Sequence, residues 1–159
     1  MSDRAYVFGY LPGATVPELL GQVIVFETGK MGKLADGAVT GNSGFCRFKY
    51  APSWLAQAKA FAVDPDLLPL DEREFESQPG WEVFSALRDA APDFWGRKVL
   101  ERQLGRIGLT ELEFLLATGD QRTGALAFST ERTFERTERG TQSIDRSSSR
   151  IAPLIRLIA

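Results

Sequence analysis

The feature that most constrains the fold is the separation of two hydrophobic patterns along the chain. Strand patterns, either alternating residues or short runs of Val, Ile and aromatic residues, occupy the first fifty residues, and helical patterns begin after Pro79-Gly80. The predicted strands are 5–11, 22–27 and 45–50, with a last strand at 124–128. This order is typical of an α+β protein.

Two segments near the second strand carry further expectations. The consecutive apolar residues 23–26 predict a strand that is covered on both faces. The five glycines between 29 and 44 predict a long hairpin connection, and ligand binding by their backbone amides is the alternative. Cys46, within the third strand, is expected to be a small buried apolar side chain.

The helices are predicted from proline positions and apolar spacing. Pro52 suits the first turn of a short helix that carries Trp54, and Pro92 suits the first turn of another, with Asp93 inside that turn. A further short helix carries Val83, Phe84 and Leu87 on one face. The apolar stripe of the Pro92 helix is Trp95, Val99, Leu100 and Leu104. We therefore expect Trp54 and Trp95 in the core.

The clearest local signal lies at residues 109–114. Thr110 and Glu113 are spaced as a capping box, and Leu109 and Phe114 are spaced as the hydrophobic staple around it. A helix is therefore predicted to begin after Thr110 and to end near Gly119.

Composition excludes several classes of function. The 159 residues contain no His, so Ser-His-Asp and Cys-His nucleophile systems and His metal sites are ruled out. They contain one Cys, so an intrachain disulfide is ruled out as well. The net charge of −2 argues against direct nucleic-acid binding. The sequence shows no signal peptide and no long apolar run, so we expect a cytoplasmic protein with no membrane partner.

Five segments in order resemble the N-terminal domain of HipA-type toxin kinases. Residues 89–97, Asp-Ala-Ala-Pro-Asp-Phe-Trp-Gly-Arg, are similar to the family's Asp-x-x-Pro-Asp-x-Trp-Gly-Arg helix start. Residues 67–70 contain its Leu-Pro-Leu segment, and residues 45–55 contain its Phe-x-Tyr strand end followed by Trp-Leu. Residues 11–17 with 21–23 resemble its opening, and residues 115–128 resemble its closing signature. The resemblance spans about residues 4–128.

The resemblance implies a small α+β domain. We expect a small antiparallel β-sheet or partial barrel packed against several short α-helices over residues 1–128. Residues 129–159 are expected to be a linker or an aberrant C-terminal tail leading toward a missing kinase core. The family's partners are the kinase core, in cis or in trans, and a helix-turn-helix HipB-like antitoxin; a homodimer is a further expectation.

The parent family uses ATP and Mg²⁺, whereas no cofactor is expected in this chain. The family's Asp, followed five positions later by Asn, is absent because the only Asn is Asn42 and residue 37 is Gly. The family's Gly-Ala-Gln-x-Lys loop is also absent. Residues 119–124 resemble a phosphate loop but lack Lys and precede a strand, so they are predicted to be a turn.

Three accounts fit the sequence: a fragment of a longer kinase, a frameshifted product, or a stand-alone regulator. We favour the first two because the tail after about Thr137 no longer resembles the family. An enzyme that uses carboxylates alone is disfavoured because no convergent acidic pair is visible.

Four residues are candidates for a partner interface. Trp81 follows Pro79-Gly80 and is expected either to anchor an interface or to pack locally. Asp93 and Arg97 are predicted to form a helix start and a surface ion pair, and Arg122 lies in the 119–124 turn. No catalytic, cofactor or metal ligand is predicted.

Overall fold

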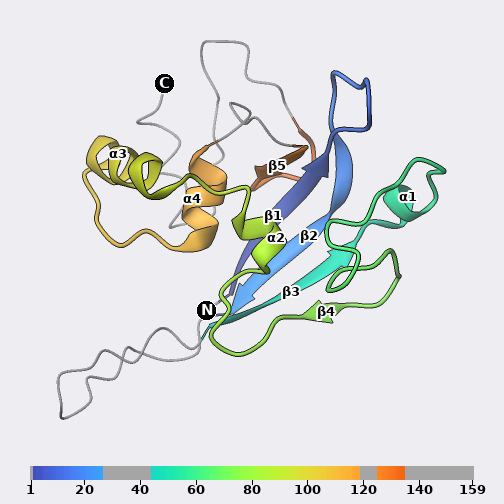
Figure 1. The fold of residues 1–159 in the computed structure, drawn as a ribbon, viewed down its shortest axis with the longest axis horizontal. Helices are drawn as coiled ribbons and strands as arrows, with labels where there is room; N and C mark the ends of the chain where they lie inside the picture. Colours follow the sequence, from blue (N-terminus) through green and yellow to red (C-terminus); the bar gives the residue numbers. More distant parts are fainter. Residues whose placement is uncertain (1, 27–43, 119–124, 135–159) are drawn as a thin grey trace.

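A computed structural model describes residues 2–26, 44–118 and 125–134. Its framework is an open antiparallel sheet with the strand order β4-β3-β2-β1-β5 (Figure 1). The strands are β1 (Ser2–Gly9), β2 (Glu18–Phe26), β3 (Phe45–Tyr50), β4 (Phe75–Glu76) and β5 (Leu126–Ser129). The expectation of an α+β fold with a small antiparallel sheet is confirmed, in its open form.

The strand positions follow the sequence pattern closely in the middle of the sheet and less closely at its ends. β3 has the predicted bounds, whereas β2 begins four residues before its predicted start at Gln22. β4 lies in a segment for which the sequence predicted no strand, and it pairs with β3 through Arg47 and Glu76. Two residues of pairing are too few to leave an alternating pattern.

Gly21 is needed where β2 passes β3. A Cβ atom at this position would lie 2.4 Å from the carbonyl oxygen of Lys49, well inside contact distance. Gly21 lies opposite Tyr50 in the β2–β3 register and opposite Val7 in the β1–β2 register. Gly21 therefore lies inside β2, and its lack of a side chain allows β3 to approach closely.

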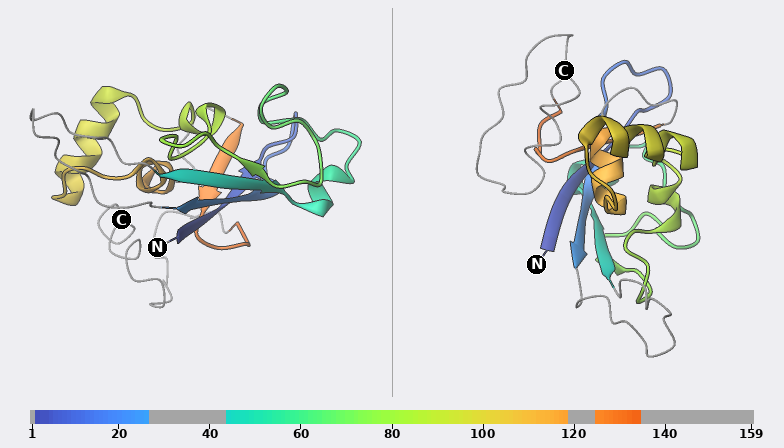
Figure 2. Two further views of the ribbon diagram at one scale, coloured as in Figure 1. Left: turned by 90° about the horizontal axis from the view of Figure 1, so that it is seen from below. Right: turned by 90° about the vertical axis from the view of Figure 1, so that its left-hand side faces the viewer.

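Four short helices complete the described part of the fold. They are α1 (Pro52–Leu55), α2 (Ser85–Arg88), α3 (Phe94–Leu104) and α4 (Glu111–Ala117). Viewed along the sheet edge, α2 and α3 lie on one side of the sheet (Figure 2). α4 lies between α3 and the sheet (Figure 1) and contacts β5, while α1 packs against β2.

The core lies between the sheet and α1, α2 and α4, and Trp54 belongs to it as predicted. The Trp54 side chain is fully buried, and its indole donates a hydrogen bond to the Phe61 carbonyl oxygen at 3.2 Å. Tyr50 is also buried: its hydroxyl donates to the Leu68 carbonyl oxygen at 2.6 Å and accepts from the Val63 amide at 2.9 Å. The core therefore fixes the irregular segment after α1.

Three predictions about burial and helix starts are corrected. Trp95 is 73% exposed and not in the core, and α3 contains no buried residue. In β2, Val23 and Val25 are buried, whereas Ile24 and Phe26 are only partly buried, so the strand is not covered equally on both faces. Asp93 is the N-cap of α3 and lies before its first turn. The predicted glycine-rich connection of residues 29–44 lies outside the described residues, apart from Gly44.

Candidate interaction site

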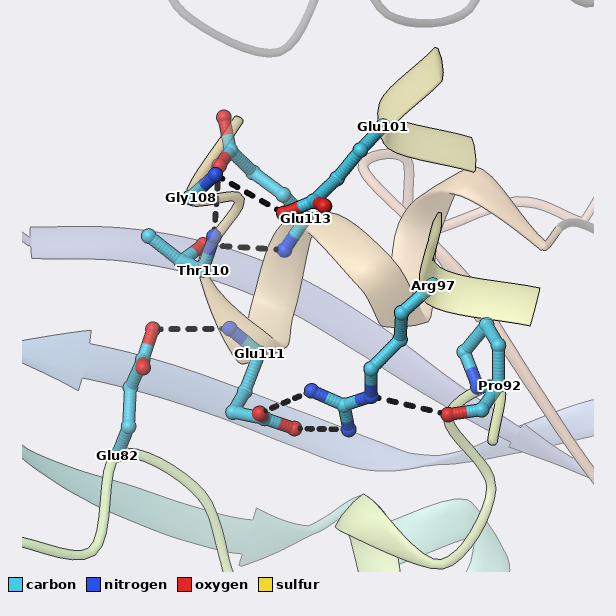
Figure 3. Close-up of polar contacts among 8 residues, drawn as sticks. All are labelled: Glu82, Pro92, Arg97, Glu101, Gly108, Thr110, Glu111 and Glu113. Atoms are coloured by element: carbon cyan, nitrogen blue, oxygen red, sulfur yellow. Dashed lines mark hydrogen bonds and ion pairs between the residues drawn. The ribbon is translucent and has the colours of Figure 1, made fainter. Parts of the chain in front are cut away.

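α3 is held to the rest of the domain mainly through Arg97. Its guanidinium forms a bidentate pair with the Glu111 carboxylate, with Nη1–Oε1 and Nη2–Oε2 distances of 2.5 and 2.8 Å (Figure 3). Its Nε also donates to the Pro92 carbonyl oxygen at 3.0 Å. The guanidinium carbon lies 4.7 Å from the centre of the Phe114 ring, within cation–π range. One side chain thus joins the start of α3 to the start of α4.

The N-terminus of α4 is fixed by the predicted capping box. The Thr110 hydroxyl accepts from the Glu113 amide at 3.1 Å, and the Glu113 carboxylate accepts from the Thr110 amide at 2.9 Å. Leu109 and Phe114 pack in one small apolar cluster with the partly buried Leu100 and Leu104 of α3. The capping box and the staple are therefore confirmed, and the staple forms part of the α3–α4 contact.

The loop from α3 to α4 is closed by a second carboxylate. Glu101 accepts from the Gly108 amide at 2.9 Å (Figure 3) and pairs with the Lys98 ammonium at 3.2 Å. Gly105 ends α3 in the left-handed region at φ 62°. α3 and the loop that follows it are therefore a defined unit with its own polar contacts.

Hydrogen bonds and nearby charges shift the pKa values of two side chains at this junction, Arg97 and Glu101. The hydrogen bonds that the Arg97 guanidinium donates to Glu111, together with the nearby Glu82 carboxylate, raise the pKa of Arg97. Glu82 also accepts a hydrogen bond from the Glu111 amide at 3.2 Å (Figure 3). The Gly108 amide and Lys98 lower the pKa of Glu101, so its contribution to stability is lost only as pH falls below its ordinary range.

The opposite face of α3 is exposed and includes apolar side chains. Phe94 is 76%, Trp95 73% and Val99 40% exposed. At about 100° per residue, Trp95 and Val99 point away from Arg97, Leu100 and Leu104, the side chains that hold α3 in place. An α-helix of eleven residues thus presents its aromatic side chains away from the domain to which it is attached.

The family model described as the HipA N-terminal domain matches residues 23–129. The chain belongs to the HipA N-terminal domain family. No curated protein matches the chain. The matched region of this HipA N-terminal domain begins inside β2, yet β1 lies between β2 and β5 in the sheet. Residues before the matched region are therefore part of the same folded unit.

The four predicted interface residues of this HipA N-terminal domain lie in different surroundings. Asp93 accepts from the Gly96 amide at 2.8 Å as the N-cap of α3, while Arg97 pairs with Glu111, so the predicted surface pair between Asp93 and Arg97 is wrong. Trp81 is 42% exposed, and the Ser77 hydroxyl donates to its carbonyl oxygen at 2.8 Å. Arg122 lies outside the described residues.

Sequence reasoning missed Glu111 as the partner of Arg97 and Phe94 and Trp95 as exposed residues. The pairing spans fourteen positions, which helix spacing rules do not cover. The sequence did contain a signal for the orientation of the Pro92 helix, because the charged Arg97 lies on the same helix face as the apolar Leu100 and Leu104. A charged residue on the predicted inner face indicates that part of the apolar stripe points elsewhere.

The described residues contain neither a membrane-spanning helix nor a metal-binding cluster. No helix among them is long and apolar enough to cross a membrane. In the same part of the chain, no group of three or more Cys, Asp and Glu side chains could hold a metal ion. The site that the described residues offer is the α3–α4 unit.

Proposed function

We propose that this chain is a non-catalytic interaction and regulatory domain of a HipA-type serine/threonine kinase toxin of a type II toxin–antitoxin system. It packs against the kinase core and holds its orientation. The supporting observation is family membership through a domain that precedes the kinase core in such proteins. The kinase motifs, the Asp with an Asn five positions later and the Gly-Ala-Gln-x-Lys loop, do not occur in the chain.

The form of the domain supports an interaction role. α3 is connected to α4 by directed polar contacts, and its exposed residues include the aromatic Phe94 and Trp95. Rigid elements that display aromatic side chains are the usual source of binding energy in protein interfaces. Contacts with a helix-turn-helix antitoxin, or between two copies of the domain, are further parts of this proposal.

The test uses a HipA-type kinase core that is encoded without an N-terminal domain. The purified full chain is titrated into it, and association is followed by isothermal titration calorimetry. We expect a saturable complex in which the kinase retains its autophosphorylation activity. Absence of association at concentrations up to the solubility limit would reject the proposal.

The alternative is a stand-alone antitoxin-like regulator that inhibits a separate kinase core in trans. The net charge and the absence of catalytic motifs suit either role, so the direction of the activity change distinguishes them. Inhibition on mixing, with relief of toxicity on co-expression, supports the regulator. Binding that leaves autophosphorylation intact supports the orienting domain.

A further inference from the structure

The sheet has a second face, on the side away from α2 and α3, which we call the rear face (Figure 2). Phe8 of β1 is 2% and Ala127 of β5 is 1% exposed, and the two residues lie opposite each other in the β1–β5 register. Their strand neighbours Val7 and Phe128 belong to the core that the described residues form between the sheet and the helices, whereas Phe8 and Ala127 do not. Because successive residues of a strand point to opposite faces, Phe8 and Ala127 must be covered from the rear face.

The segment that follows β5 provides a cover for Phe8. Residues 130–134, which we call the strap, lie on the side of the sheet away from α2 and α3 (Figure 2). A local turn begins the strap, in which the Ser129 hydroxyl accepts from the Glu131 amide at 3.0 Å. The Phe134 ring then lies against the Phe8 ring, with 5.1 Å between the ring centres and an angle of 57° between the ring planes. Aromatic pairs favour such tilted arrangements.

The strap is anchored mainly by one side chain. Glu131, Arg132 and Thr133 are exposed, whereas Phe134 is partly buried. A contact between two aromatic rings changes a local equilibrium by up to about tenfold. Whether the end of the strap rests on the sheet therefore depends on Phe134.

We propose that Phe134 is a positioning residue, which fixes the point at which the chain leaves the domain to the rear face of the sheet. The chain beyond the strap then starts on the side of the sheet opposite to α3. The consequence for a kinase core joined in cis rests on the proposed function: the core is held through an anchored exit, and not through a linker that is free from the end of β5 onward. The competing account is that Phe134 adds to the stability of the domain without fixing the exit.

Limited trypsin digestion of the full chain separates these two accounts. Cleavage after Arg132, followed by mass spectrometry, requires release of the strap, so its rate reports how often the strap opens. Phe134→Ser should raise this rate about tenfold, and Phe134→Tyr, which keeps the ring, should leave it at the wild-type value. Thr110→Ala is the matched control, because it removes the capping box of α4 and destabilises the domain away from the strap.

The position of the exit is measured by electron–electron distance spectroscopy on the chain with spin labels at Lys49→Cys and Thr137→Cys in a Cys46→Ala background. Lys49 is an exposed residue of β3 that alternates with the buried Phe48 and Tyr50, so it lies on the rear face. Thr137 is three residues beyond Phe134. We expect a narrow distance distribution in the wild-type strap and a broader one with Phe134→Ser.

Three results would overturn the inference: an equal rise in cleavage after Arg132 in Thr110→Ala, no rise in Phe134→Ser, or a distance distribution as broad in the wild-type strap as in Phe134→Ser. If Phe134→Ser does not fold, Phe134→Leu replaces it, with a smaller expected rise that is judged by the same criteria. Neither measurement contains the kinase core, so a failure here leaves the proposed function intact. Absence of binding in the calorimetric titration would reject the proposed function and would leave the position of the exit unchanged.

Discussion

Replacing Arg97 with alanine removes three contacts of α3 at once: the bidentate pair with Glu111, the hydrogen bond to the Pro92 carbonyl oxygen and the packing on Phe114. The Glu111 carboxylate would then face Glu82 without its counter-charge. α3 has no buried apolar residue that could replace these contacts. We therefore expect both a lower free energy of unfolding and a looser α3.

The burial of the pair sets the magnitude. The side chains of Arg97 and Glu111 are 25% and 23% exposed, so the pair lies nearer the buried limit than the exposed one. Removing one partner costs about 3–5 kcal/mol in a fully buried pair, whereas an exposed pair contributes about 0.2–1 kcal/mol. An intermediate loss of about 2–3 kcal/mol is expected for Arg97→Ala. Arg97→Lys keeps the charge but loses the bidentate geometry, and should retain part of the stability.

Urea denaturation followed by tryptophan fluorescence measures this loss, and hydrogen exchange of the α3 amides measures the loosening. Lys98→Ala is the matched control, since Lys98 is 56% exposed and pairs with Glu101 on the same helix. Lys98→Ala should lower the free energy of unfolding by less than about 0.5 kcal/mol. This loss should disappear in 1 M salt, where the Debye length is about 3 Å and exposed charges are screened. If Arg97→Ala were no more destabilising than Lys98→Ala, or left α3 exchange unchanged, the anchoring role of Arg97 would be refuted.

Three further changes test other parts of the fold. Thr110→Ala removes the capping box and should lower the free energy of unfolding by about 1 kcal/mol in urea denaturation. Gly21→Ala places a Cβ against the Lys49 carbonyl oxygen in the middle of the sheet, so a loss of about 1–3 kcal/mol or a failure to fold is expected in the same assay. Burial raises the pKa of the Cys46 thiol to about 11, so iodoacetamide should modify it slowly at pH 8 in the native protein and rapidly in urea. Because the pKa is raised on folding, the stability due to this neutral thiol is complete below about pH 8.5 and is lost toward pH 11.

The elements with purely local causes could be predicted from the sequence. The α4 start follows from Thr110 and Glu113, whose side chains and amides lie three residues apart and need no tertiary partner. β3 was predicted with its observed bounds because its two faces differ clearly: Cys46 and Phe48 are fully buried, and Lys49 is exposed. In both cases the information lies within a few residues.

The direction of α3 could not be predicted in this way. Trp95, Val99, Leu100 and Leu104 were treated as one stripe, but they divide between opposite faces of the helix. Hydrophobicity alone favours Trp95 inward, because it is the largest of the four. What decides the orientation is the long-range pair of Arg97 with Glu111, which no local pattern encodes.

The residues of α3 that contact the rest of the domain differ from those that are exposed to a partner. If Phe94 and Trp95 held α3 in place, they would be buried inside the domain and would not be available to a partner. Because Arg97 and the packing of Leu100 and Leu104 hold α3 instead, Phe94 and Trp95 remain exposed. A partner that binds them pays little ordering entropy, since the rings are already on a rigid element. Loss of Arg97 should therefore weaken binding to any partner that contacts Phe94 and Trp95, even though Arg97 itself is paired with Glu111 and need not touch that partner.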